Sequence, residues 1–98
     1  MTFAEDVYKL TARIPAGRVS TYKEIAEKLG VKAYRAVGNA LNKNPYSPKV
    51  PCHRIVSSDG SIGGFASGTG NKIKILAKEG VEVKDNMIVG FEKKLFRF

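Results

Sequence analysis

The 98-residue chain is 43% hydrophobic and 27% charged, a balance that predicts one globular domain with a modest core and excludes a disordered chain. Seventeen Lys and Arg against nine Asp and Glu give a formal net charge of +8, which favours a polyanionic partner such as nucleic acid. The sequence has no apolar run near the roughly 20 residues of a membrane span, no secretory signal and no cysteine pair, so we expect a cytoplasmic protein with no membrane partner.

The first predicted helix begins after Thr2, where Glu5 three residues later gives a capping-box pattern. The sequence Pro-Ala-Gly at residues 15–17 is expected to end it. Apolar residues at helical spacing predict its buried face: Phe3, Val7, Leu10 and Ile14. We assign this helix no chemistry.

Two short helices joined by a tight turn are predicted over about residues 21–44. Thr21 begins the first as a capping residue, and Gly30 ends it in the left-handed conformation. The second runs from about 33 to 43, before Asn44-Pro45. The pair matches a helix-turn-helix, and an ordinary helical hairpin with a solvated basic face is the alternative. Small or outward-facing polar residues of the second helix are candidates for contacts in a DNA groove: Ala33, Tyr34, Arg35, Ala36, Gly38, Asn39, Asn42 and Lys43.

The only Cys and the only His lie side by side, as Cys52 and His53, in the sequence Pro-Cys-His-Arg-Ile-Val of residues 51–56. A thiolate is a strong nucleophile, and a neighbouring imidazole is a common acceptor of the thiol proton. The alternative is a small buried Cys beside a satisfied core His. One Cys and one His supply too few ligands for zinc, so we expect no metal and no cofactor.

The remaining elements are a short buried strand at Ile55-Val56, a glycine-rich loop over residues 57–70, a helix and a hairpin. The loop admits a ligand close to its backbone but matches no phosphate-binding motif. Asn71 is the expected N-cap of the helix, and the hairpin covers residues 81–89. Three residues are expected to face inward from that helix: Ile73, Leu76 and Ala77. The basic and aromatic tail, residues 91–98, either packs on the body or faces nucleic acid.

With these motifs in order, the chain resembles the carboxy-terminal, DNA-binding and active-site domain of the O6-alkylguanine-DNA alkyltransferase family. The matching stretches together cover roughly residues 3 to 80: 14–22, 35–38, 44–45, 51–56, 63–65 and 72–80. The resemblance implies a mostly α fold with a small β element, namely a helix-turn-helix (winged-helix-like) domain spanning residues 1–98. It also implies that the amino-terminal domain usual in the family is absent, which bears on stability and rate more than on chemistry.

The resemblance further implies DNA repair by direct reversal. A monomer would bind double-stranded DNA through the minor groove, flip an O6-alkylguanine out and transfer the alkyl group irreversibly to Cys52. His53 would polarise the thiol through a water, and Glu79 would orient the imidazole, as in hydrolase triads. Tyr22 would neutralise the guanine at ring N3, and Asn44 would tie the recognition helix to the active-site turn.

For the DNA and the pocket, the resemblance implies that Arg35 fills the gap left by the flipped base. Further residues would surround the guanine: Ile55, Phe65, Ala66 and Lys72. The chain departs from the common family pattern at Phe65-Ala66, where many members have Tyr-Ser, and at Tyr34, where small residues are common.

Three other readings compete with the transferase. An alkyltransferase-like protein binds the lesion and recruits other repair proteins; its cysteine is typically replaced, often by tryptophan, whereas Cys52 is present here. A helix-turn-helix transcription regulator would read the major groove and leaves Cys52, His53 and the glycine loop unexplained. A cysteine hydrolase would need an oxyanion-hole motif, and none is evident.

Overall fold

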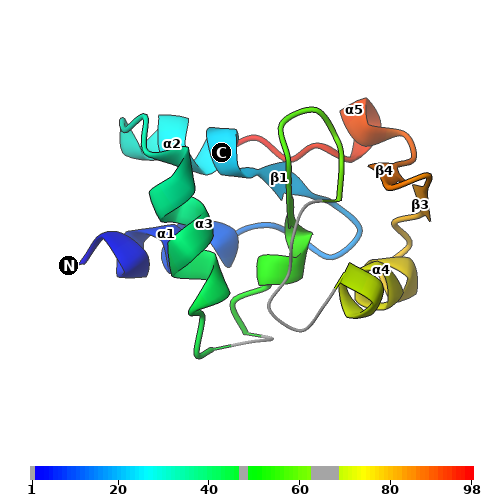
Figure 1. The fold of residues 1–98 in the computed structure, drawn as a ribbon, viewed down its shortest axis with the longest axis horizontal. Coiled ribbons are helices and arrows are strands. Elements are labelled where there is room, and N and C mark those ends of the chain that lie inside the picture. The colour runs from blue at the N-terminus through cyan, green and yellow to red at the C-terminus, as the bar shows by residue number, and fades with distance from the viewer. Residues whose placement is uncertain (1, 47–48, 63–68) are drawn as a thin grey trace.

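The computed structural model of the chain describes residues 2–46, 49–62 and 69–98 (Figure 1). The elements in chain order are α1 (Phe3–Thr11), β1 (Ser20–Thr21), α2 (Tyr22–Leu29), α3 (Tyr34–Asn42), the 3-10 turn η1 (Cys52–Arg54), β2 (Ile55–Val56), α4 (Thr69–Lys78), β3 (Val83–Lys84), β4 (Met87–Ile88) and α5 (Phe91–Lys94). The prediction of a mostly α helix-turn-helix fold with a small β element is confirmed. Within the described ranges, no helix is both long and apolar enough to cross a membrane.

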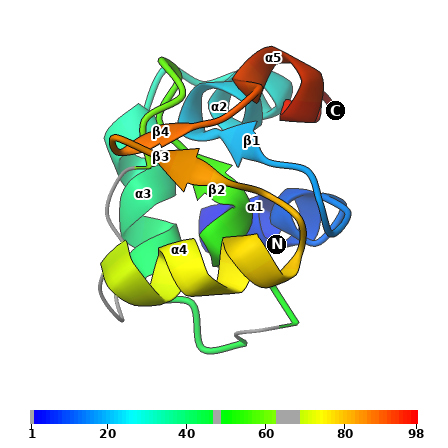
Figure 2. The ribbon, with the colours of Figure 1, turned by 90° about the vertical axis from the view of Figure 1, so that its right-hand side faces the viewer.

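The short parallel pair β1–β2 lies between two groups of helices (Figure 1). Helices α1, α2 and α3 gather at one end, while α4, the β3–β4 hairpin and α5 gather at the other, as the turned view in Figure 2 also shows. Ser20 pairs with Ile55 and Thr21 with Val56. Because successive side chains of a strand point to opposite faces, Ile55 joins one hydrophobic cluster and Val56 joins the other. The two-residue strand β2 therefore connects both halves of the core.

The helix-turn-helix follows the predicted pattern closely. The hydroxyl of Thr21 accepts a hydrogen bond from the backbone N–H of Glu24 at 3.0 Å, which caps α2. Gly30 ends this helix with a left-handed φ of 74°. Helix α3 then packs its apolar face against α1 and α2. Its buried residues are those predicted: Val37, Ala40 and Leu41.

Helix α1 ends earlier than the apolar spacing indicates. It stops at Thr11, and the backbone N–H groups of Arg13 and Ile14 bond back three residues instead of four. This tighter turn fits the restriction that Pro15 places on the residue before it. Ile14 is buried as predicted but lies outside the helix, and the prediction that Phe3 belongs to the core is wrong, because its side chain is 36% exposed.

Helix α4 begins at Thr69, so Asn71 lies inside its first turn and the prediction of an Asn71 N-cap is wrong. Its buried face also differs from the prediction: Ala77 is exposed, and Lys72 is fully buried. The helix still ends where expected, since Gly80 turns the chain with a φ of 87° just after Glu79.

The carboxy-terminal tail packs on the body, which is one of the two predictions made for it. The backbone N–H of Val19 donates to the carbonyl of Lys94 at 2.9 Å, and the N–H of Phe96 donates to the carbonyl of Val19 at 2.6 Å. Upstream of the tail, β3 and β4 form the predicted antiparallel hairpin, with Asp85 and Asn86 at positive φ in its turn.

Candidate active site

Cys52 opens η1, between the buried Pro51 and strand β2. Its backbone N–H donates to the carbonyl of Val50 at 2.8 Å, and the N–H of Arg54 donates to the carbonyl of Pro51 at 2.9 Å. The thiol is free and partly exposed at the edge of the cluster formed by α1, α2 and α3. The backbone is thus held in place, and the residue as a whole is only partly buried.

His53 is only 3% exposed, and its Nε2 lies 3.0 Å from Oε1 of Glu79. Burial raises the pKa of Glu79, but hydrogen bonds from Arg54 and His53 outweigh burial and hold that pKa below its ordinary value. The carboxylate is therefore ionised at neutral pH and accepts the Nε2 proton, which assigns the lone pair of the neutral ring to Nδ1.

Burial also lowers the pKa of His53. The hydrogen bond and charge of Glu79 oppose this shift, whereas the positive charges of Arg54 and Lys72 add to it. The imidazole of His53 is consequently neutral near pH 7 and can accept a proton.

Lys72 lies inside the same region, fully buried on α4. Its ammonium donates to the carbonyl of Ile55 at 2.6 Å. Burial lowers the pKa of Lys72 to about 8, against the opposing effect of Cys52. The backbone N–H of Ile55 is also engaged, because it donates to the carbonyl of Cys52.

Tyr22 and Tyr8 are the phenols whose charge would interact with Cys52. Burial and then Cys52 raise the pKa of Tyr22, so its hydroxyl is a proton-bearing donor at neutral pH. Burial, Tyr46 and Cys52 raise the pKa of Tyr8, whose hydroxyl donates to the carbonyl of Ala40 at 2.7 Å. Sequence reasoning missed Tyr8, because nothing in the spacing of α1 reveals that this helix passes near η1.

Asn44 connects the end of α3 to the segment before Cys52. Its Nδ2 donates to the carbonyl of Val50 at 2.8 Å, and its Oδ1 accepts from the backbone N–H of Tyr46 at 2.9 Å. The same carbonyl of Val50 accepts from Cys52, so one backbone oxygen links the amide of Asn44 to the start of η1.

The outward face of α3 borders two adjoining grooves, and Tyr22 and Tyr34 line both. Six of the eight candidate contact residues are exposed: Ala33, Tyr34, Arg35, Asn39, Asn42 and Lys43. The other two, Ala36 and Gly38, are half-buried. One groove is lined by Tyr22, Tyr34, Arg35, Gly38, Asn39 and Asn42. The other is lined by Tyr22, Lys23, Tyr34, Ser57 and Ser58. The predicted pocket residues Phe65 and Ala66 lie outside the described residues.

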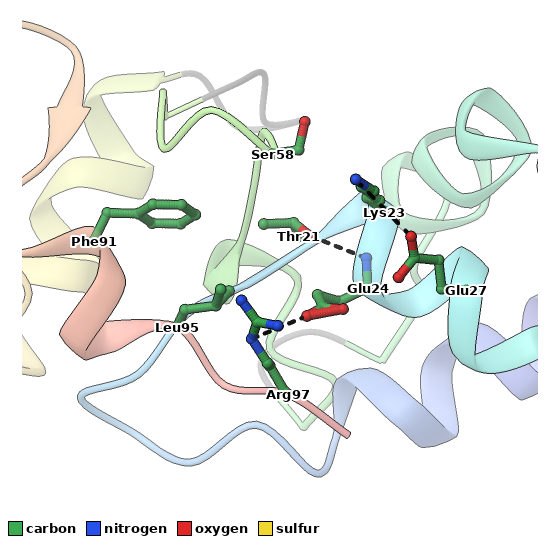
Figure 3. A pocket seen from close by; sticks show the side chains of 8 residues that line it. All are labelled: Thr21, Lys23, Glu24, Glu27, Ser58, Phe91, Leu95 and Arg97. Carbon is green, nitrogen blue, oxygen red and sulfur yellow. Dashed lines mark hydrogen bonds and ion pairs between the residues drawn. The ribbon is translucent and has the colours of Figure 1, made fainter.

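A separate pocket lies at the amino end of α2, against the tail (Figure 3). Its charged side chains pair with one another: Nε of Arg97 is 3.5 Å from Oε1 of Glu24, and Nζ of Lys23 is 4.0 Å from Oε1 of Glu27. This internal pairing offsets the charges, so we assign the pocket no ligand. Within the described ranges there is also no group of three or more His, Cys, Asp or Glu side chains that could hold a metal ion.

The fold defines a helix-turn-helix protein in which Cys52 precedes the buried His53, and His53 is hydrogen-bonded to Glu79. The chain belongs to the family described as the DNA binding domain of 6-O-methylguanine DNA methyltransferase, whose sequence model matches residues 2–81. The resemblance seen in the motifs is thereby confirmed.

Individual relatives agree with this assignment. The methylated-DNA–protein-cysteine methyltransferase of Methanosarcina barkeri is 47% identical over 78 residues, which are 79% of this chain and 49% of that protein. The crystal structure of Mycobacterium tuberculosis OGT in complex with DNA aligns with a TM-score of 0.77 at 38% identity, over 81% of this chain and 50% of that one. The chain spans between 30% and 54% of the length of the curated relatives it matches.

A shorter protein matches almost end to end. S. pombe Atl1, solved in complex with damaged DNA containing O6-carboxymethylguanine, aligns with a TM-score of 0.82 at 30% identity. The alignment covers 98% of this chain and 95% of that one.

Proposed function

We propose that this protein repairs duplex DNA by direct reversal, moving an alkyl group from O6 of guanine irreversibly to Cys52. The observation that carries the proposal is a partly exposed Cys52 next in sequence to a neutral His53, which contacts an ionised Glu79 beside the helix-turn-helix. Family membership supports DNA as the partner, and the charge of +8 supports binding to its phosphates. We treat residues 1–98 as one DNA-binding and active-site domain that acts as a monomer.

The proposed reaction begins with proton transfer. His53 Nδ1 takes the thiol proton of Cys52 through a water, and Glu79 stabilises the imidazolium that forms. The thiolate then attacks the alkyl carbon, so that an S–C bond forms while the C–O6 bond breaks and its electron pair passes to the guanine. Tyr22 donates a hydrogen bond to ring N3, where negative charge develops. The released guanine anion then takes up one proton from water, and the imidazolium of His53 gives one proton back to water. The thioether is stable, so each molecule reacts once.

The DNA part of the proposal concerns α3. This helix would enter the minor groove, where its small residues Ala33, Ala36 and Gly38 allow close approach and Asn42 and Lys43 contact the strand edges. Arg35 would occupy the stack after the damaged nucleotide has flipped out, which costs a few kcal/mol and least for a damaged pair. Both side chains that border the adjoining grooves, Tyr22 and Tyr34, would lie along the path of the flipped nucleotide.

A second candidate is a lesion-binding protein without transfer activity that recruits other repair proteins. The structural likeness to S. pombe Atl1, which was solved in complex with damaged DNA, favours it. The presence of Cys52, next to a neutral His53 that is hydrogen-bonded to Glu79 and can accept a proton, favours the transferase. A transcription regulator leaves this array without a role.

The deciding experiment is mass spectrometry of the intact protein and of its Cys52 peptide after incubation with a duplex containing O6-methylguanine. We expect a gain of one methylene on Cys52, stoichiometric with protein, and none in Cys52→Ala, which should still bind the lesion duplex. Tight lesion binding without a mass change in the wild-type protein would support the second candidate. Methyl transfer to the Cys52→Ala protein would refute the proposed chemistry.

A further inference from the structure

The proposed reaction gives no part to Arg54 of the Pro-Cys-His-Arg sequence, yet three hydrogen bonds hold its side chain. Nε donates to Oε1 of Glu79 at 3.0 Å, and Nη2 donates to Oε2 at 2.5 Å. Nη1 donates to the carbonyl of Ile14 at 2.7 Å. The side chains of Arg54 and Glu79 are only 17% and 16% exposed, so this is a shielded, bidentate ion pair. Its two hydrogen bonds from Arg54 to Glu79 form a fork.

The position of Glu79 leaves its carboxylate free to rotate unless a second contact restricts it. Glu79 follows the last residue of α4, immediately before Gly80 turns the chain in the left-handed conformation. Its carboxylate has several rotatable bonds, and its last torsion has no strong preference. The hydrogen bond with His53 uses Oε1 alone. The planar guanidinium of Arg54 contacts both oxygens and so fixes the plane of the carboxylate, which a single hydrogen bond leaves free.

Arg54 also balances the charge of Glu79. In the described part of the chain, the charged groups that act on His53 are Glu79, just past the end of α4, Lys72 on α4 and Arg54 on η1 itself. Glu79 raises the pKa of His53, while Arg54 and Lys72 lower it. An uncompensated carboxylate would favour the imidazolium, and an imidazolium cannot accept the thiol proton.

We propose that Arg54 is a positioning residue of this site: its fork holds Glu79 in register with His53 and offsets the carboxylate charge, so that the imidazole stays a proton acceptor. The consequence for alkyl transfer rests on the proposed function. The consequence for His53 itself does not, because it concerns the protein without DNA.

The sequence makes this testable, since His53 is the only histidine and Cys52 the only cysteine. A proton NMR titration therefore follows one imidazole, and a haloacetamide reports one thiol. We expect the midpoint of His53 to rise by about 0.5–1 pH unit in Arg54→Gln. The acid limb of the pH profile of Cys52 alkylation, by haloacetamide or by methylated DNA, should move upward by the same amount.

Arg54→Lys separates charge from geometry, because lysine keeps the positive charge and loses the fork. We expect its His53 midpoint to stay near the wild-type value, while the rate at pH 7 falls roughly tenfold. Arg97→Gln, which removes a 77%-exposed guanidinium outside the site, is the matched control and should change neither quantity.

A folded Arg54→Gln protein with an unchanged His53 midpoint and an unchanged alkylation profile would overturn the proposal. If Arg54→Gln fails to fold, Glu79→Gln serves instead. That variant removes the charge that Arg54 balances, so the titration midpoint of His53 should fall. An unchanged midpoint would equally overturn the proposal. Failure of methyl transfer from DNA, with the titration behaving as expected, would reject the proposed function and leave the role of Arg54 intact.

Discussion

Cys52 and His53 are sequence neighbours, yet the state of the imidazole depends on Glu79, which lies 3.0 Å from it across the fold. Burial keeps the ring neutral, and in the proposed reaction the carboxylate would stabilise the imidazolium that forms when the thiol loses its proton. Tyr22 has the opposite property: its raised pKa keeps the hydroxyl protonated, so that it can donate a hydrogen bond. The same region therefore holds a neutral imidazole, which can accept a proton, and a protonated phenol, which can donate one.

The Tyr22→Phe variant tests the donor at the residue scale. The ring and its packing remain while the hydroxyl is lost, so we expect single-turnover transfer to slow by about 10–100-fold, with duplex affinity changed less than about threefold. Rapid-quench kinetics and fluorescence anisotropy measure the two quantities. Tyr8→Phe is the control, since it removes a phenol that donates to Ala40, and it should reduce stability by about 1 kcal/mol with little effect on transfer. Equal loss of rate in both variants would contradict the assignment of Tyr22.

At the scale of elements, α2 begins directly at β1, so its cap and the sheet share a residue. Thr21 belongs to β1, is 3% exposed, and caps α2 through its hydroxyl. Thr2 makes the corresponding 3.2 Å bond at the exposed start of α1.

We expect Thr21→Ala to lower the free energy of unfolding by about 1–2 kcal/mol, because a buried cap is lost together with a packed methyl group. Thr2→Ala should cost less, about 0.5–1 kcal/mol, because water can replace an exposed cap. Urea unfolding measures both, and Thr21→Ser should recover the hydrogen-bonded part. A larger loss in Thr2→Ala than in Thr21→Ala would contradict this account.

The buried contact between Lys72 of α4 and the carbonyl of Ile55 in β2 leads us to expect that the free energy of unfolding depends on pH. Lys72 has a folded pKa of about 8 against 10.5 for the ordinary side chain. Between these pH values the unfolded chain binds more protons at Lys72 than the folded chain, so stability rises with pH across this window. The full rise is up to about 3 kcal/mol.

Urea unfolding at pH 7.5 and 9.5 in a Cys52→Ala background, which removes titration of the thiol, measures the effect. Lys72→Met should lose the rise, whereas Lys74→Met, at an exposed position of the same helix, should keep it. Parallel pH dependence in Lys72→Met and its parent would show that Lys72 is not the group responsible.

For the whole molecule, the tail joins the two hydrophobic clusters. Phe91 packs against the cluster of β2, α4 and the hairpin, while Phe96 and Phe98 pack against the cluster of α1, α2 and α3. Arg18 fixes the connection by donating to the carbonyls of Lys94 and Leu95 at 3.1 and 2.7 Å. The tail lies beyond residues 2–81, which the family model matches, and it contacts both hydrophobic clusters.

The net charge of +8 leads to a prediction for the whole molecule. Affinity for an undamaged duplex should fall at least about tenfold between about 50 and 200 mM salt, because binding releases counterions from the phosphates. The preference for a duplex with O6-methylguanine over an undamaged one should change far less, since the pocket contacts add no phosphate charge. Anisotropy titrations of both duplexes across this range measure it, and affinity independent of salt would contradict a phosphate-dominated interface.

Local sequence rules determined much of this protein. Capping residues, Gly30 and the spacing of apolar side chains predicted α2 and α3 to within about one residue, because these signals act inside one helix. Cys52 and His53 indicated the candidate site because they are adjacent in the sequence. The functional roles of these residues, and of Glu79, Tyr22 and Arg35, stay predictions until the variants are measured.

Only the tertiary structure decided which distant groups meet. Strands β1 and β2 have two residues each, too few for any periodicity, and they exist because residues 35 apart in sequence pair side by side. The burial of Lys72 and the fork of Arg54 on Glu79 likewise depend on where α4 lies relative to η1. Such contacts follow from packing that buries apolar area over the whole chain, and no stretch of sequence carries that information alone.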